Sequence, residues 1–203
     1  MNAIRMSRWR WRGVYHMSDL AIYSKVVFEP DDVVELRFIK KGERPLIRKD
    51  WKLAANLPSA AAELTSINRD GFDIYAGPNP RTAKGVSGDA NVQMARCLFC
   101  DFDHVEPGDG CGPSEFVSMD IFEAGLPEPN LYLNSGNGIH VYWRLTNPVM
   151  DLAVWTGMQE RLNARLEADP VIKNPERIMR LPGFINWKSP QTESYVIHEN
   201  VRA

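Results

Sequence analysis

The chain has 203 residues, of which 44% are hydrophobic, and its formal net charge is −2 at pH 7. This length fits one large domain or two small ones, and a charge so near zero does not indicate a nucleic-acid-binding protein. There is no apolar stretch long enough for a membrane span or a secretion signal, and the three cysteines are an odd, low number. We therefore expect a cytoplasmic protein with no membrane partner and no structural disulfide.

Residues 1–16 are basic, with four arginines and no acidic residue. The string Arg8-Trp9-Arg10-Trp11-Arg12 alternates cations with aromatic side chains, as proteins that bind single strands do. The alternative is a disordered arm, or an extended reading frame that precedes a natural start at Met17. We expect residues 1–16 to be a disordered arm, and both interpretations of its role stay open.

The next part of the chain predicts a small α/β subdomain, residues 17–92. Its elements are a strand over 31–39, a helix over 50–69 interrupted at Pro58, a strand over 72–76, a turn at Gly77-Pro-Asn-Pro-Arg81 and a polar loop over 82–92.

Residues 93–203 predict a more regular subdomain. Its elements are a strand over 96–103, a helix over 113–124, strands over 130–134 and 139–145 joined by a glycine-rich turn, a helix over 150–168 and a strand over 194–198. The order β-α-β-β-α-β is that of the split βαβ or RRM-like arrangement, which places both helices on one face of an antiparallel sheet. We expect the α+β fold class, with this RRM-like half packed against the N-terminal subdomain and its second sheet face free for a ligand.

Asp101 and Asp103 lie two apart at the end of a short apolar run. In a strand they share a face and lie about 7 Å apart. Two such carboxylates repel each other unless a cation lies between them, and Mg²⁺ or Mn²⁺ prefers oxygen ligands of this kind. The pattern predicts metal-assisted phosphoryl chemistry, and a strand end that runs into a polar turn is the alternative.

A zinc site built from Cys97, Cys100, His104 and Cys111 is not expected. Positions three apart on a strand point to opposite faces, so Cys97 shares the face of Phe99 and the two aspartates while Cys100 faces the core. Buried cysteines of this kind behave as small hydrophobic residues.

Two further strings carry groups that bind phosphate. The hairpin turn offers Ser135 and Asn137 as donors with two glycines beside them, and His140 follows directly. After the last long helix, Arg177 and Arg180 lie on one face of a helical turn, and Asn186 and Lys188 share a face of an extended segment. Asp169, at the end of that helix, is placed to supply a third carboxylate. The alternatives are a structural histidine and a solvated face of locally paired arginines.

Taken in order, these strings resemble the archaeo-eukaryotic primase superfamily, above all the primase-polymerases of plasmids, phages and mobile elements. They are Cys100-Asp101-Phe102-Asp103, Ser135-Gly-Asn-Gly-Ile-His140 and the segment from Arg177 to Lys188. Such chains also carry an upstream Asn-Pro-Arg turn, here Asn79-Pro80-Arg81. One position departs from the family, which often has serine two residues before the histidine, where this chain has Gly138.

The resemblance implies that Asp101 and Asp103 are the metal-binding pair and Asp169 the third acid, with Asp151 and Glu176 as alternatives. It implies that His140 contacts the nucleotide phosphates and that the segment from Arg177 to Lys188 binds the nucleotide.

The expected protein is a DNA primase/polymerase that transfers nucleotidyl groups from nucleoside triphosphates to a 3′-hydroxyl on a single-stranded, primed DNA template, with Mg²⁺ or Mn²⁺ as cofactor. The alternatives are a non-catalytic RRM-like nucleic-acid-binding module of a replication initiator and a metal-dependent nuclease. Binding through an RRM sheet uses exposed aromatic residues where this sheet has acids, and a nuclease has little need of the triphosphate donors. The sequence holds no helicase motif, so a helicase partner would lie on a separate chain or in a missing region.

Overall fold

The computed structural model describes residues 15–103, 112–188 and 191–200. The predicted arm lies outside the described residues except for its last two, with which helix α1 (Tyr15–Val27) begins. Within the described residues, no helix is long and apolar enough to cross a membrane.

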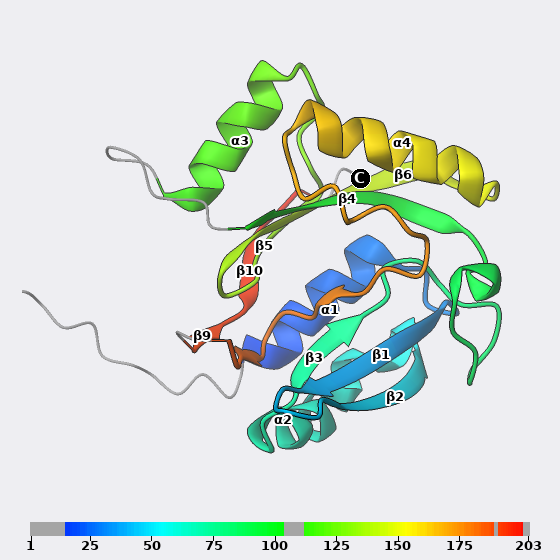
Figure 1. Cartoon of the computed structure of the whole chain (residues 1–203), viewed down its shortest axis with the longest axis vertical. Helices are drawn as coiled ribbons and strands as arrows, with labels where there is room; N and C mark the ends of the chain where they lie inside the picture. The colour runs from blue at the N-terminus through cyan, green and yellow to red at the C-terminus, as the bar shows by residue number, and fades with distance from the viewer. Residues whose placement is uncertain (1–14, 104–111, 189–190, 201–203) are drawn as a thin grey trace, which may run out of the picture.

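Two four-stranded antiparallel sheets make up most of the molecule (Figure 1). The first has the order β2-β1-β3-β7. Its strands are β1 (Val33–Lys40), β2 (Leu46–Leu53), β3 (Asp73–Ala76) and β7 (Met179–Arg180). The apolar side chains Leu36, Phe38 and Ile74 alternate along β1 and β3 and are buried in one cluster with residues of α1 and of helix α2 (Ala61–Arg69).

The helix predicted over 50–69 is wrong in its first part. Leu46 to Leu53 is a strand that pairs with β1 along its whole length, from Val33 opposite Leu53 to Lys40 opposite Leu46. The strand is exposed or half-buried throughout, so its sequence carries no clear apolar period, and backbone pairing with β1 decides its conformation. Short 3₁₀ turns, η1 (Ala54–Asn56) and η2 (Pro58–Ala60), then lead into α2.

The second sheet confirms the predicted β-α-β-β-α-β order. Its strands are β4 (Ala95–Asp103), β5 (Leu131–Asn134), β6 (Gly138–Val149) and β10 (Tyr195–Glu199), with helices α3 (Pro113–Glu123) and α4 (Leu152–Arg165). The spatial order is β10-β5-β6-β4. In a plain split βαβ sheet the last strand would lie beside the first, which is β4 here. Instead β10 lies beside β5, so β4 is an edge of this sheet. Both helices cover one face, where Cys100 and Val141 pack with Val117 and Leu162 (Figure 1).

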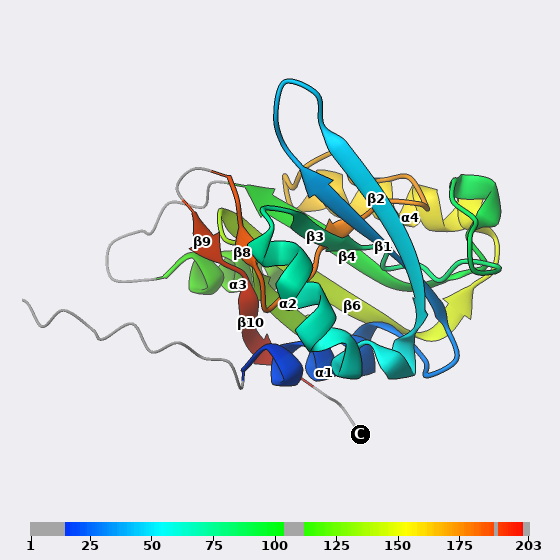
Figure 2. The ribbon, with the colours of Figure 1, turned by 90° about the horizontal axis from the view of Figure 1, so that it is seen from below.

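The other face of this sheet is not free, which corrects the sequence-based expectation. Phe99, Leu133 and Tyr142 are buried in one cluster with Leu20 and Tyr23 of α1, and α1 lies between the two sheets (Figures 1 and 2). The apolar residues of that face need burial, and α1 supplies it. At the end of β4 and the start of β6, Asp101, Asp103 and His140 make this face polar instead.

The chain after α4 returns to the first sheet. Met179 and Arg180 form β7 beside β3, and β8 (Ile185–Asn186) then pairs with β9 (Thr192–Glu193). A second-half segment is therefore part of the N-terminal sheet. The proposed division into 17–92 and 93–203 stays a prediction.

Candidate metal centre and its surroundings

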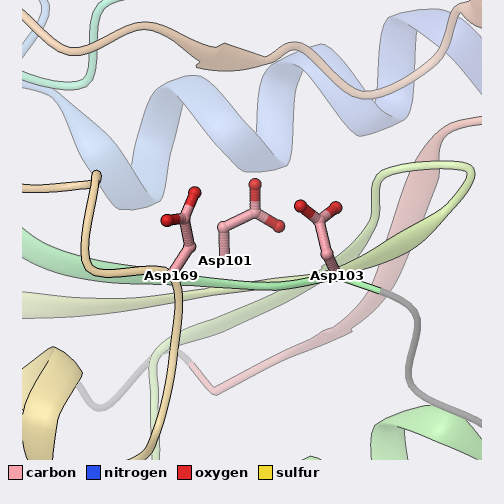
Figure 3. A group of neighbouring side chains, drawn as sticks. All are labelled: Asp101, Asp103 and Asp169. Atoms are coloured by element: carbon pink, nitrogen blue, oxygen red, sulfur yellow. The ribbon is translucent and has the colours of Figure 1, made fainter.

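Three aspartates lie together at the polar end of β4. Asp101, Asp103 and Asp169 each offer an oxygen within 4.8 Å of the others (Figure 3). The first two come from β4, and Asp169 comes from the loop after α4. The Asp169 N–H donates to the Asp101 carbonyl oxygen at 3.1 Å, so the loop is fixed to the edge of β4 by its backbone. The geometry suits a hard divalent cation, because such ions bind several carboxylate oxygens at once.

The two alternative third acids have other tasks. Asp151 caps α4, where its carboxylate accepts hydrogen bonds from the N–H groups of Ala153 and Val154. Glu176 accepts a hydrogen bond from Arg37 at 2.9 Å. Neither belongs to the aspartate group within the described residues.

His140 lies directly opposite Asp101 in the β4–β6 ladder, and its Nε2 is 3.4 Å from Asp101 Oδ1. The imidazole is buried, and its Nδ1 has no hydrogen-bond partner among the described residues. Burial by itself raises the pKa of Asp101, but His140, Lys188 and Arg180 together outweigh it and hold that pKa below its ordinary value. Positive charge therefore surrounds the innermost acid.

Arg180 does not share a helical turn with Arg177, because it lies in β7 and Arg177 lies in the turn before it. Its guanidinium donates to Asp73 Oδ1 at 2.7 Å and to the Tyr75 hydroxyl at 2.9 Å, and lies 4.8 Å from the centre of the Tyr75 ring. Arg177 instead donates to the Val171 carbonyl. Pairing of β7 with β3 separates the two arginines and orients Arg180.

The glycine turn packs closely between β4 and the β8–β9 hairpin. A Cβ at Gly138 would lie 2.3 Å from the Phe102 carbonyl oxygen, so the serine common in the resembling family does not fit here without a shift. Gly136 has φ +97°, and a Cβ there would lie 2.6 Å from Thr192 Oγ1. The Ser135 hydroxyl donates to the Gly138 carbonyl within the turn, while the Asn137 side chain is half-buried.

Asn186 joins this turn to Lys188. Its Nδ2 donates to the Ser135 carbonyl at 3.0 Å, and its Oδ1 accepts from the Lys188 N–H at 3.0 Å. The side chain is buried, and Lys188 is exposed beside the aspartates. The structure thus brings Ser135, His140, Arg180, Asn186 and Lys188 around one centre, and their roles as nucleotide ligands stay predictions.

Sequence reasoning missed two buried anchors. Asp73 is 1% exposed and accepts from both Arg180 and the Trp187 N–H, at 2.7 and 2.8 Å. Arg81, of the Asn-Pro-Arg turn, is fully buried and pairs with Glu35 at 2.7 Å, and its guanidinium also donates to the Glu176 carbonyl. The available signal was a charged residue within an apolar strand, Val34-Glu35-Leu36, which predicts a buried and paired charge.

The cysteines of β4 lie as predicted. Cys97 is buried with Phe99, and Cys100 is buried on the opposite face with Val117 and Leu162. Burial raises the pKa of Cys97 to about 12, so the thiol is inert. His104 and Cys111 lie outside the described residues.

No family model matches the sequence, and no curated protein matches it. Solved structures do match. The primase-polymerase domain of cyanophage S-2L is 22% identical with a TM-score of 0.66, and the match covers 90% of each chain. The catalytic domain of primase RepB′ in complex with initiator DNA is 16% identical with a TM-score of 0.67, covering 91% of this chain and 85% of that one. A second structure of primase RepB′ is 15% identical with a TM-score of 0.66, and the match covers 91% of this chain and 56% of that one.

The chain therefore has the fold of the archaeo-eukaryotic primase-polymerase domains. The resemblance to the plasmid and phage type is confirmed at the level of the fold, as is the α+β class.

Replacing Asp73 by alanine should destabilise the protein by about 3–5 kcal/mol, because it leaves the buried Arg180 charge without its partner. Urea unfolding of Asp73→Ala, compared with Asp70→Ala on the exposed end of α2, measures the loss. Adding Arg180→Met should recover part of it. Equal free energies of unfolding for Asp73→Ala and Asp70→Ala would contradict the claim that Asp73 stabilises the fold through Arg180.

Stability should fall with acidification through protonation of Glu35. Burial raises the pKa of Glu35, but hydrogen bonds and charge from Arg37 and Arg81 outweigh it, so the folded pKa lies below the ordinary value. The stabilisation is present above the unfolded pKa and is lost as pH falls through the folded pKa. Glu35→Gln should be less stable at neutral pH with a shallower acid dependence in urea titrations, whereas the exposed Glu199→Gln should follow the wild type.

Proposed function

We propose that the chain is a DNA primase/polymerase that transfers nucleotidyl groups from nucleoside triphosphates to a 3′-hydroxyl on a DNA template. The observation that carries the proposal is the group of three aspartates at the end of an edge strand of a primase-polymerase fold, with His140, Arg180 and Lys188 beside it. The nucleotidyltransferase class rests on that fold. The described residues fit a divalent cation, since three carboxylates meet there with one of them exposed.

Bound Mg²⁺ or Mn²⁺ would be held by Asp101, Asp103 and Asp169 and would supply charge stabilisation to the attacking and leaving oxygens. The chain's own residues position the nucleotide. Arg180 has its guanidinium oriented by Asp73 and Tyr75, and the backbone of Lys188 is held by Asn186, which leaves the exposed ammonium of Lys188 beside the aspartates. His140 is buried at the start of β6, and Asn137 lies half-buried in the closely packed turn before it. Such positioning is the main contribution that a protein makes to phosphoryl transfer.

The partners proposed are a single-stranded DNA template with its primer, nucleoside triphosphates and, for replication, a helicase on another chain. The RepB′ domain is described in complex with initiator DNA, which supports a DNA partner for this fold. A binding-only module would not need three gathered carboxylates, and a nuclease would not need the oriented cations that face them. These two features favour polymerisation over both alternatives.

Loss of the paired acids should abolish incorporation without unfolding the domain. We expect Mg²⁺ or Mn²⁺ to support template-directed extension, and Asp101→Ala combined with Asp103→Ala to remove it, because two of the three carboxylates that would hold the ion are lost. Gel analysis with ribo- or deoxynucleotides, with and without primer, measures this alongside urea unfolding. Extension by the double variant would disprove the assignment.

His140→Ala should lower kcat/KM for nucleotide by about ten- to a hundredfold, since one charge-assisted hydrogen bond is worth roughly 1.5–3 kcal/mol. Metal affinity, followed by Mn²⁺ titration, should change little. His198→Ala on the exposed strand β10 is the matched control. Wild-type nucleotide kinetics in His140→Ala would return this residue to a structural role.

A further inference from the structure

A row of side chains crosses the whole first sheet from the metal centre to the outer edge. The register places Arg180 opposite Tyr75, Tyr75 opposite Arg37, and Arg37 opposite Lys49. Residues directly opposite in an antiparallel sheet point to the same face, so three cations and one aromatic ring share one line. The row begins at Arg180 in β7 and ends at Lys49 in β2.

The β1–β2 hairpin continues this row with a dense positive charge. Residues 40–49 are all exposed, and they contain five cations and one acid. The cations are Lys40, Lys41, Arg44, Arg48 and Lys49. The hairpin extends beyond the body of the sheet (Figure 2). Because the whole chain has a net charge of −2, this concentration is local and marks a surface for a polyanion.

Some of these cations have partners within the protein, and others have none among the described residues. Lys40 donates to the Asp70 carbonyl and Arg48 lies 4.7 Å from the Phe72 ring centre, both on the face of the sheet opposite the row. Within the row, Lys49 donates to Ser87 and lies 3.6 Å from Glu35, and Arg37 pairs with Glu35 and Glu176. Within the described part of the chain, Lys41 and Arg44 at the tip have no hydrogen-bond or ion-pair partner. Leu46 and Ile47, between the cations, are 47% and 56% exposed. Exposed apolar side chains between cations suit a strand that presents both bases and phosphates.

We propose that this basic face, the row from Arg180 to Lys49 together with hairpin 40–49, binds the single-stranded template on its way to the metal centre. The proposal rests on the proposed function and adds to it the surface that holds the nucleic acid. Four strands about 4.8 Å apart span about 14 Å. That length accommodates about four nucleotides at a stacked rise of 3.4 Å. The exposed cations of the hairpin contact phosphates, while Tyr75 and Ile47, which point to the same face as the row, contact bases.

The test is the salt dependence of binding to a short single-stranded DNA oligonucleotide, measured by fluorescence anisotropy without nucleotide or metal. Lys41→Glu combined with Arg44→Glu should lower the slope of log K against log salt by about 1.4, and Lys49→Gln by about 0.7. At about 50 mM salt, the double variant should bind roughly ten- to a hundredfold more weakly. Lys25→Glu combined with Arg161→Glu, on α1 and α4, makes the same charge change elsewhere and should bind nearly as the wild type does.

The outcomes separate this surface from the proposed chemistry. If the hairpin variants bind DNA as the control does, while the acid variants lose incorporation, the basic face is wrong and the proposed function stands. If the hairpin variants lose DNA binding while the acid variants still extend primers, the basic face stands and the proposed function is wrong. A duplex that competes better than the single strand would overturn the single-stranded template as the occupant. Urea unfolding of each variant excludes loss of folding as the cause.

Discussion

Three carboxylates with oxygens within 4.8 Å of one another repel, and the surrounding residues place positive charge beside them that offsets this repulsion. His140 faces Asp101 from the neighbouring strand, and Arg180 and Lys188 approach from the segment that crosses to the first sheet. The Arg180 guanidinium is itself held by Asp73, and Asn186 holds the backbone of Lys188. An isolated carboxylate group of this density would protonate or spread apart, whereas here the positive charge around it favours the ionised form that a metal needs.

The segment 169–188 connects the two sheets and contacts both of them. Asp169 is hydrogen-bonded to the edge of β4, Arg180 belongs to the first sheet, and Asn186 contacts the glycine turn of the second sheet. One stretch of chain thus connects the acids, the cations and the turn. The buried Glu35–Arg81 pair, through its hydrogen bond to Glu176, holds the same segment from the other side. Distortion of either anchor would displace the acid and the cations together.

The sheet that carries the acids divides its inner face between two uses. Along most of its length that face is apolar and buried under α1, while Asp101 and Asp103 at the end of β4 and His140 at the start of β6 are polar. The close approach at Gly138 lets the two strands end together, so Asp103 and the turn reach the same level. A rigid, buried platform therefore positions the few polar groups, as precise sites require.

Local patterns determined much of this protein. The alternation that puts Asp101 and Asp103 on one face follows from the two-residue period of a strand, as does the separation of Cys97 from Cys100. The β-α-β-β-α-β order followed from apolar periods and glycine turns. Tertiary structure alone decided that residues 46–53 form a strand, that α1 covers the inner face, and that Arg180 meets Asp73, 107 residues earlier. Those outcomes depend on pairing and burial between distant segments, and such contacts leave no period in the local sequence.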